Sequence, residues 1–488
     1  MLYTSGSPFR FHWPGGVLRL SQDMAKKLFS RPMKEGQCVL VAALALGLIY
    51  LLFRYFAVSQ AVPVVSVSPL RVLREEYTIW PAFISKLPHI PEWYTNECFD
   101  GRTSEDLEEI FGSLIPTWAE SLHLDCQDAY ALFLEMFEVH QRVSGPLEMP
   151  KAFAKKVQAW LGGDEAFKEK IDKQAIIHVF HPLVAEHVVY NPVRAQRPMP
   201  SQEKDIFQWV DERVIKTEGN CDFCRHSSYT ASDKFGRHET KDTVRVSNTF
   251  KMDVHHSMVV PSHVHHPLHL PLPLLMHLFE EATQWFFDVS QQEPHYIYPN
   301  IAWDTLFHAG ASQVHPHIHM MLAPDHYYGS MEGLRAAAQT YFRVTGRNYF
   351  NSLVSIHGAL GLAVEYGDAV ALANLVGKGD LEVMILSDIP SKDFFSLIYF
   401  AVQAFHDTFK QPCKSLAGAW PALGMSRNAS LGRLPAIARM VSRGDCTSLR
   451  ADFSTFEIFQ AVFKPHNPWQ LATAIRKSIE KYDTQKKE

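Results

Sequence analysis

Three histidines stand at alternate positions in the segment His315-Pro316-His317-Ile318-His319. Alternate side chains of a β-strand lie on one face, so the three imidazoles are expected in a row, about 6.6 Å apart. An imidazole can serve as a nucleophile, as a metal ligand or as a partner for phosphate. A solvated or hydrogen-bonded histidine face without chemistry is the alternative. The row therefore predicts a reactive or metal-binding site.

A second group of candidate ligands lies earlier in the chain. Cys221 and Cys224 form a CxxC pair, whose spacing suits two thiolates on one zinc ion, with a redox pair as the alternative. Imidazoles that can complete a tetrahedral site follow in one short segment: His263, His265, His266 and His269. Two cysteines with two histidines are typical of a closed structural zinc site, which would brace the strand that carries the histidine row.

The histidine row is preceded by four small residues, 309–312 (Ala-Gly-Ala-Ser). Backbone N–H groups in a turn of small residues can approach phosphate oxygens closely. The turn and the histidines together favour chemistry on a phosphate compound.

The composition limits the class of protein. A chain of 488 residues is too long for one ordinary domain, and 47% apolar with 20% charged residues is typical of a globular fold. The formal charge of −5 and the absence of a long basic run give no reason to expect nucleic-acid binding. Seven cysteines are too few for a disulfide scaffold. We expect the five outside the CxxC pair to be free thiols or buried apolar residues: Cys38, Cys98, Cys126, Cys413 and Cys446.

An apolar stretch near the N-terminus predicts a membrane anchor. Residues 38–53 carry no charge, and the stretch continues past Arg54 to Val58. About twenty apolar residues span a bilayer, whereas a signal peptide or a buried core helix is the alternative. The preceding residues 1–37 carry six basic and two acidic side chains. By the positive-inside rule this basic tail stays cytoplasmic, so the sequence predicts a transmembrane helix at 38–58 and a linker at 59–96.

Residues 97–174 have helical periodicity without any motif for chemistry. Apolar residues recur at helical spacing in three runs: Leu107, Ile110, Phe111 and Leu114; Leu132, Phe133, Met136 and Phe137; Phe153, Val157, Trp160 and Leu161. These stripes predict the core of a small helical domain.

The rest of the chain carries one pattern twice. Strand-like runs and a helix-like run occur at 188–190, 244–246, 257–260 and 271–289, and again at 369–376, 381–386 and 394–405. Aligning Pro316 with Pro435 sets Ala436 opposite His317 and Ala438 opposite His319. We expect an α+β unit at 175–345 and a degenerate copy at 346–488 that has lost the histidines, with chance similarity as the alternative.

At these residues the chain resembles the galactose-1-phosphate uridylyltransferase family of the histidine-triad (HIT) superfamily. The resemblance spans about residues 175–475 and rests on motifs in the family's order: 181–183 (HPL), 190–198 (YNPVRAQRP), the CxxC pair, 246–250 (VSNTF), 260–263 (VPSH), 310–312 (GAS) and 315–317 (HPH). It implies an α+β fold of duplicated histidine-triad-like units, each an antiparallel sheet with helices.

The resemblance also implies roles for individual residues. His317 takes the place of the nucleophile. A structural zinc ion is expected on Cys221, Cys224, His263 and His315, with His265 or His266 as replacements for His263. The nucleotide and its phosphates are expected on Arg194, Arg197, Asn248, Asn300 and Ser312, although Asn300 lies four residues further from the motif than the family pattern requires.

One departure bears on the reaction. The transferase motif continues His-Pro-His-x-Gln, but His319 stands where the glutamine belongs. A third histidine is typical of the hydrolase branch of the superfamily. His319 is therefore a second catalytic candidate, and the identity of the acceptor stays open.

The expected function is that of a nucleotidyltransferase or phosphorylase. It would act on a nucleoside diphosphate sugar or a related nucleotide through a covalent nucleotidyl-histidine intermediate, with phosphate or a sugar phosphate as acceptor. A histidine-triad nucleotide hydrolase and a catalytically silent, membrane-tethered nucleotide-binding protein are the alternatives. A homodimer is a further expectation.

Charge and cysteine usage conflict over the compartment. The charge asymmetry around 38–58 favours a lumenal catalytic region in the secretory system, and Asn428-Ala429-Ser430 would then be a glycosylation sequon. Free zinc thiolates are easier to keep in a reducing compartment. We give the charge rule more weight and expect a single-pass membrane protein with its catalytic region in the lumen.

Overall fold

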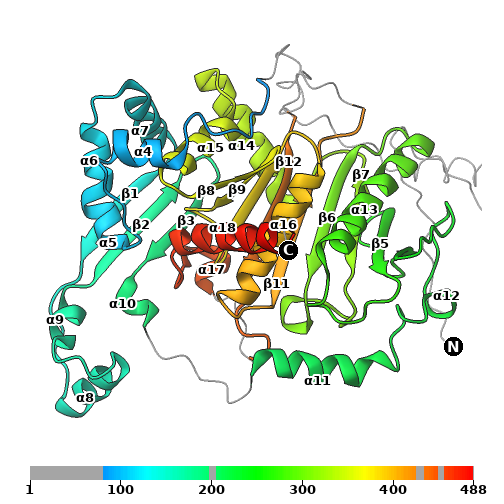
Figure 1. Cartoon of the computed structure of the whole chain (residues 1–488), viewed down its shortest axis with the longest axis horizontal. Helices are drawn as coiled ribbons and strands as arrows, with labels where there is room; N and C mark the ends of the chain where they lie inside the picture. Colours follow the sequence, from blue (N-terminus) through cyan, green and yellow to red (C-terminus); the bar gives the residue numbers. More distant parts are fainter. Residues whose placement is uncertain (1–80, 197–204, 425–432, 449–454, 487–488) are drawn as a thin grey trace, which may run out of the picture. The chain divides into compact units, whose positions relative to one another are not determined.

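The computed structural model describes residues 81–196, 205–424, 433–448 and 455–486. All of them belong to one compact unit, Arg74–Glu488 (Figure 1). Segment 38–58, Arg197 and the Asn428 sequon lie outside the described residues.

The first part of this unit combines helices with a small sheet. The helices are α4 (Pro91–Cys98), α5 (Leu107–Glu109), the π-helix η1 (Ile110–Leu114), α6 (Ile115–Glu120), α7 (Leu124–Met136), α8 (Lys151–Trp160) and α9 (Phe167–Asp172). Strands β1 (Glu138–Val143), β2 (Ala175–His181), β3 (Glu186–Tyr190) and β13 (Val462–Phe463) form a sheet in the order β1-β2-β3-β13. The apolar stripe of α5 and η1 is buried as expected, whereas Phe153 and Trp160 of α8 are exposed.

A nine-stranded sheet occupies the rest of the unit (Figure 1). Its order is β4-β5-β7-β6-β11-β12-β10-β9-β8. The strands are β4 (Thr243–Ser247), β5 (His255–Pro261), β6 (Tyr298–Asp304), β7 (Ile318–Ala323), β8 (Ala363–Tyr366), β9 (Ala369–Ala373), β10 (Val383–Ser387), β11 (Lys414–Ala419) and β12 (Ala436–Ser442). All of their pairings are antiparallel. The α+β class with antiparallel sheets is therefore confirmed.

The remaining helices connect and cover these strands. They are α10 (Pro192–Ala195), α11 (Ile206–Glu218), α12 (His226–Tyr229), α13 (Leu272–Gln292), the 3₁₀ turn η2 (Phe307–Ala309), α14 (Gly329–Thr345), α15 (Tyr349–Ala359), α16 (Lys392–Asp407), α17 (Thr455–Phe459) and α18 (Pro468–Gln485). Helix α13 packs on β4, β5 and β7, and α16 packs on β8, β9 and β10. The apolar faces of both helices fill one continuous core.

The two halves of the large sheet have matching topology. In the first half, β4 and β5 are followed by a long helix and by β6 and β7, in the order β4-β5-β7-β6. In the second half, β9 and β10 are followed by α16, β11 and β12, in the mirrored order β11-β12-β10-β9. The halves meet where β6 pairs with β11.

The register corrects the residue-level alignment expected from the sequence. One row of directly paired residues crosses the sheet: Met258, His319, Ala302, Ala417 and Arg439. Directly paired residues lie on the same face, so Arg439 shares the face of His319, and Ala438 lies on the other face. Aligning Pro316 with Pro435 was wrong by one residue, which in a strand exchanges the two faces.

The small sheet covers the second half on the face that Arg439 shares with His319. Arg439 donates to Glu382 at 2.6 and 2.8 Å and to Glu186 of β3 at 2.9 and 3.1 Å. The hydroxyl of Tyr190 in β3 donates to the carbonyl of Leu375. In the first half, the corresponding face carries His319 and the segment around Cys221. This face of the large sheet is therefore covered by the small sheet in the second half, whereas in the first half it carries the histidines.

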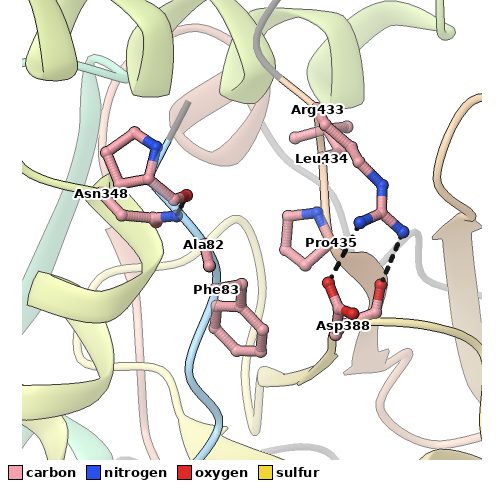
Figure 2. A pocket seen from close by; sticks show the side chains of 8 residues that line it. Ala82, Phe83, Asn348, Asp388, Arg433, Leu434 and Pro435 are labelled. Atoms are coloured by element: carbon pink, nitrogen blue, oxygen red, sulfur yellow. Dashed lines mark hydrogen bonds and ion pairs between the residues drawn. The ribbon is translucent and has the colours of Figure 1, made fainter. Parts of the chain in front are cut away.

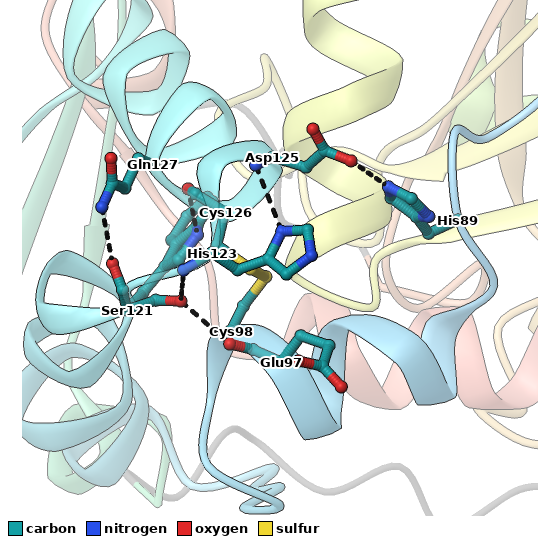
Figure 3. The surroundings of a disulfide bond; sticks show 9 residues. His89, Glu97, Cys98, Ser121, His123, Asp125, Cys126 and Gln127 are labelled. Atoms are coloured by element: carbon teal, nitrogen blue, oxygen red, sulfur yellow. Dashed lines mark hydrogen bonds and ion pairs between the residues drawn. A yellow bond between two sulfur atoms is a disulfide. The ribbon is translucent and has the colours of Figure 1, made fainter.

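Four of the remaining cysteines are paired. Disulfides join Cys98 to Cys126 and Cys413 to Cys446, each with a Cα–Cα distance of 5.4 Å. The first ties the end of α4 to the first turn of α7, beside the Ser121 hydroxyl bonded to the Glu97 carbonyl (Figure 3). The expectation of free thiols was wrong for these four, because tertiary packing brings together cysteines 28 and 33 residues apart. Cys38 lies outside the described residues.

The expectation of a single-pass membrane protein is contradicted. Across the described ranges, no helix combines the length and the apolar character needed to cross a bilayer. The expectation of a lumenal catalytic region was inferred from that anchor, so it is corrected together with it.

Candidate active site and metal centre

The histidine segment enters β7 from a constrained turn. Strand β7 begins at Ile318, so His315 and His317 precede it and His319 lies within it. In the turn before them, Leu306 has φ +69° and Gly310 has φ +108°. Glycine adopts such a φ freely, but a buried leucine in this region stores strain of about 1–3 kcal/mol. Strain of this kind is concentrated at functional sites.

Four ligand atoms converge beside this segment. The candidate ligands Cys221, Cys224, His265 and His315 place one atom each within 4.8 Å of one another. His315 Nδ1 lies 3.6 and 3.4 Å from the two Sγ atoms and 3.3 Å from His265 Nδ1. A tetrahedral zinc ion with ordinary bond lengths requires S···N distances of roughly 3.5 Å and an N···N distance of roughly 3.3 Å. The cluster therefore fits zinc without rearrangement.

His315 and His265 each form a hydrogen bond through the ring nitrogen that faces away from the cluster, and this bond prepares the other nitrogen as a ligand. His315 Nε2 lies 2.9 Å from the carbonyl oxygen of Pro261, which can only accept a proton. His265 Nε2 lies 3.0 Å from Thr217 Oγ1, whose own hydrogen is donated to the Arg213 carbonyl. Each Nε2 is therefore protonated, and each Nδ1 offers its lone pair to the cluster. In the absence of a cation, burial and Cys221 raise the pKa of the Cys224 thiol to about 12, and a cation would reverse that effect.

His265 takes the place that the motif assigned to His263. His263 is exposed and lies outside the cluster, whereas His265 is buried. Strand β5 ends at Pro261, and the chain then turns toward α11, where Thr217 meets His265. His265 is one of the two replacements for His263 that the sequence left open, and the geometry favours it.

His317 is held as a neutral imidazole with a defined proton. Its Nδ1 lies 2.9 Å from the carbonyl oxygen of His315, so Nδ1 carries the hydrogen and Nε2 carries the lone pair. Burial lowers the pKa of His317, which keeps the ring neutral. The Phe223 ring packs against the imidazole, with 5.3 Å between ring centroids. A buried neutral imidazole with its lone pair on Nε2 is chemically a nucleophile.

His319 lies next to His317 on the same face. The two ring centroids are 5.1 Å apart, and His319 Nδ1 lies 3.0 Å from Nε2 of His256 in β5. Burial lowers the pKa of His319 to about 3 and that of His256 to about 4, so both rings are neutral near pH 7. His317, His319 and His256 thus lie side by side, whereas the side chain of His315 is directed to the cysteine cluster, so the expected row of three imidazoles on one strand face was only partly right.

Asp304 adjoins His317 from the neighbouring strand. It follows Ala302, the partner of His319, on the same face of β6. Its carboxyl bonds to Ser415, and burial raises its pKa. Arg443 donates to Ser415 Oγ at 2.8 Å and to the Ala309 carbonyl at 2.9 Å. Residues of the second half therefore support the small-residue turn before His315.

The residues expected to bind nucleotide are distributed unevenly. The Asn248 amide nitrogen lies 3.2 Å from His256 Nε2, so Asn248 adjoins the histidines, and Ser312 is exposed in the turn that precedes them in the chain. Asn300 is buried and its amide bonds to Tyr298 and Tyr328. Arg194 is exposed and stacks on Phe463, in a helix that Figure 1 draws well away from β7.

The sequence analysis missed His256, Asp304 and Arg443. A signal existed for two of them. The polar residues at 300 and 304 alternate with apolar Ile301 and Trp303, as on a half-buried strand, and His256 directly precedes the expected strand 257–260. Arg443 carried no such signal, because its role depends on the pairing of the two halves.

The start of β12 has no comparable chemistry. A pocket there is lined by eight residues: Pro81, Ala82, Phe83, Asn348, Asp388, Arg433, Leu434 and Pro435 (Figure 2). Arg433 donates to Asp388 at its rim, and Asn348 donates to the Pro81 carbonyl. No histidine lines this pocket, and in β12 Arg439 occupies the row of His319.

Several solved structures resemble this chain at low identity. An ADP-glucose phosphorylase from Arabidopsis thaliana with bound ADP-glucose is 17% identical, with a TM-score of 0.48, over 62% of this chain and 98% of that one. A uridylyltransferase is 13% identical, with a TM-score of 0.43, over 63% and 99%. A yeast Ap4A phosphorylase in complex with AMP is 12% identical, with a TM-score of 0.29, over 68% and 93%.

No protein-family model and no curated protein matches the chain. The structural neighbours include an ADP-glucose phosphorylase, a galt-like protein and uridylyltransferases, which are proteins of the kind that the motifs resemble, at 13–17% identity. Identities and TM-scores of this size do not transfer an activity. The functional argument therefore depends on the geometry around His317.

Proposed function

We propose that the chain catalyses nucleotidyl transfer from a nucleoside diphosphate compound through a covalent intermediate on His317. The observation that carries the proposal is the 2.9 Å hydrogen bond from His317 Nδ1 to the His315 carbonyl. This bond leaves the lone pair on Nε2, the nitrogen that no described group occupies, beside a turn of small residues suited to phosphate.

The reaction has two displacements. In the first, His317 Nε2 forms a bond to the α-phosphorus, and the bond to the bridging oxygen breaks, so its electron pair leaves with the distal phosphate. In the second, an oxygen of the acceptor attacks the same phosphorus, and the P–N electron pair returns to Nε2. A phosphate or sugar-phosphate acceptor needs no general base, because its oxygen is already ionised near pH 7.

The remaining groups position the phosphates. The Gly310 and Ala311 N–H groups already donate to the Phe307 and Leu306 carbonyls, so Ser312 is the donor of the turn to phosphoryl oxygens. His319 supplies a further N–H. Asp304, Ser415 and Arg443 brace the turn from the second half. Asn248, next to His256, is proposed to bind the nucleotide. Asn300 supports the strand behind the site. Arg194 lies on α10, away from β7, so the proposal does not use it, and Arg197 lies outside the described residues.

A zinc ion on the four-ligand cluster would contribute structure. With two thiolates and two imidazoles its shell is closed, so it supplies no open position for substrate. The residue that this cluster holds in place is His315, whose carbonyl orients His317.

A hydrolase is the second candidate, and one observation favours it. His319 stands where the transferase motif has glutamine, and its Nδ1 is bonded within a histidine pair. Water as acceptor must lose a proton, and the imidazole of His319 accepts it only in the tautomer that has the lone pair on Nε2. The choice of acceptor decides between phosphorylase, transferase and hydrolase.

Intact-mass analysis tests the proposal. The full chain is incubated with a panel of nucleoside diphosphate sugars and dinucleoside polyphosphates, including ADP-glucose and Ap4A, the compounds named for similar structures. We expect a mass increase of one nucleotidyl group. The increase should be absent in His317→Asn, because asparagine is of similar size but has no nucleophilic ring nitrogen. Adding labelled phosphate, sugar phosphate or water then identifies the acceptor. Failure of every member of the panel to form an adduct would favour a silent binding protein over an enzyme.

A further inference from the structure

His256 is a buried imidazole that the proposed reaction does not use directly. It lies on β5, one strand away from His319, and its side chain is 1% exposed. Three contacts surround its two nitrogens. The Met252 backbone N–H donates to Nδ1 at 3.1 Å, while Nε2 lies 3.0 Å from His319 Nδ1 and 3.2 Å from the Asn248 amide nitrogen.

The backbone contact fixes the proton on His256. A backbone N–H is always a donor, so His256 Nδ1 must hold a lone pair. The neutral ring then carries its hydrogen on Nε2. The Asn248 amide nitrogen is itself a donor, because its oxygen accepts from the Phe250 N–H at 2.8 Å. The only acceptor for the His256 Nε2 proton among these contacts is His319 Nδ1.

The same reasoning continues to His319. Since its Nδ1 accepts a proton, the neutral His319 ring must carry its hydrogen on Nε2. Burial keeps both rings neutral, which is the condition for this argument. His319 is partly exposed and adjoins His317, and the described residues offer its Nε2 no hydrogen-bond partner. This N–H is therefore able to donate to a group that binds beside His317.

Hydrogen bonds hold the loop before β5 in place, so the contact from the Met252 N–H to His256 Nδ1 is maintained. Lys251 Nζ bonds to Ser247 Oγ at 3.0 Å and to the His256 carbonyl at 3.1 Å, and Phe250 N–H is held by Asn248. The Met252 N–H therefore has a defined direction, although the Met252 side chain is 78% exposed.

We propose that His256 is a positioning residue that sets the tautomer of His319, through the chain Met252 N–H to His256 and His256 N–H to His319, so that His319 Nε2 donates to the transferred phosphoryl group. The inference rests on the proposed nucleotidyl transfer for its catalytic consequence. The tautomer itself is independent of any activity.

Nitrogen NMR of the full chain tests the tautomer without substrate. In histidine-labelled protein, long-range proton–nitrogen correlations distinguish the protonated from the unprotonated ring nitrogen. We expect His319 and His256 each to be protonated on Nε2. Protonation of His319 on Nδ1 in the native chain would overturn the proposal, whether or not the protein turns over a nucleotide.

Two nearly isosteric variants test the catalytic consequence. His256→Gln keeps an N–H donor for His319, whereas His256→Glu offers only an acceptor and should move the His319 proton to Nδ1 at about pH 8.5, where the ring stays neutral. We expect kcat to fall roughly 10- to 100-fold in the glutamate variant and by less than about threefold in the glutamine variant, with KM little changed. Equal kcat and equal nitrogen spectra in the two variants would refute the role.

The controls separate this role from a structural one. His255→Gln alters the neighbouring histidine, which bonds to Glu293 on the opposite face, and should leave kcat unchanged. In a His319→Gln background, the difference between the glutamine and glutamate variants should disappear, because no tautomer remains to be set. A difference that persists there contradicts the proposal. If all variants and the native chain are inactive while the spectra are as expected, the proposed function fails and the tautomer assignment stands.

Discussion

His317 Nδ1 lies 2.9 Å from the carbonyl oxygen of His315, and His315 Nδ1 lies 3.4 Å from Cys224 Sγ. The side chain of His315 is thus directed to the metal cluster while its carbonyl directs the nucleophile. Because one residue serves both, removal of a metal ligand should disturb the orientation of His317 without touching it. The four-ligand cluster and the imidazole of His317 are coupled through a single peptide unit.

The first prediction concerns metal content. Cys224→Ser and His265→Ala should each lower bound zinc well below one ion per chain, because three ligands hold zinc far more weakly than four. His263→Ala is the matched control and should keep full zinc, since His263 is exposed and outside the cluster. Elemental analysis of the purified variants measures this. Loss of zinc in His263→Ala with retention in His265→Ala would reverse the assignment.

The second prediction concerns the nucleophile. His317→Asn should lower turnover at least about a thousandfold and abolish the nucleotidyl adduct, because the amide nitrogen has no lone pair comparable to that of imidazole. Zinc content and melting temperature should stay near those of the native chain, because His317 is not a ligand. Single-turnover assays with zinc analysis in parallel check both parts. Residual adduct at another histidine would move the nucleophile to that residue.

The third prediction concerns the buried ion pairs of Arg439. Arg439→Met should destabilise the fold by about 3–5 kcal/mol, because it leaves Glu186 and Glu382 buried without their partner. The exposed pair Arg347–Glu135 is the control, and Arg347→Met should cost less than about 1 kcal/mol. Denaturant unfolding measures both. Equal effects of the two substitutions would show that the buried Arg439 network stabilises the fold no more than an exposed ion pair does.

The parts of the site that depend on local spacing could be predicted from the sequence. The CxxC pair and the His315–His317 segment each fix their own ligand geometry within a few residues. His265 rather than His263 could not be predicted, because the choice depends on how the chain turns from β5 toward α11. His256 and Asp304 reach the site only through the register of three strands.

The fold class and the repeated order of elements could also be predicted, because strand and helix periodicity is local. The alignment of the halves was off by one residue, since proline matching carries no information about register. The disulfides could not be predicted, because cysteines 28 and 33 residues apart meet only through tertiary packing.

The last prediction concerns a buried lysine. Lys414 in β11 is fully buried, its Nζ has no hydrogen-bond partner among the described residues, and it lies 4.8 Å from the Trp303 ring centroid. Burial lowers its pKa to about 7, and the neighbouring His406 is itself held neutral by burial. Between about pH 7 and pH 10 the unfolded chain therefore binds one proton more than the folded chain at this residue, so this group makes stability rise with pH.

Lys414→Met should remove that dependence. Below about pH 7 both states of the native chain bind the proton and the penalty is at its full size, so the variant should be more stable there, on the order of 4 kcal/mol. The difference should shrink toward zero as the pH approaches about 10. Lys216→Met, at an exposed position of α11, is the control and should shift stability by less than about 0.5 kcal/mol at every pH. Denaturant unfolding at several pH values measures the difference between each variant and the native chain, which cancels the titration of other groups. A stability gain that is the same across this range would mean that Lys414 stays charged in the folded protein.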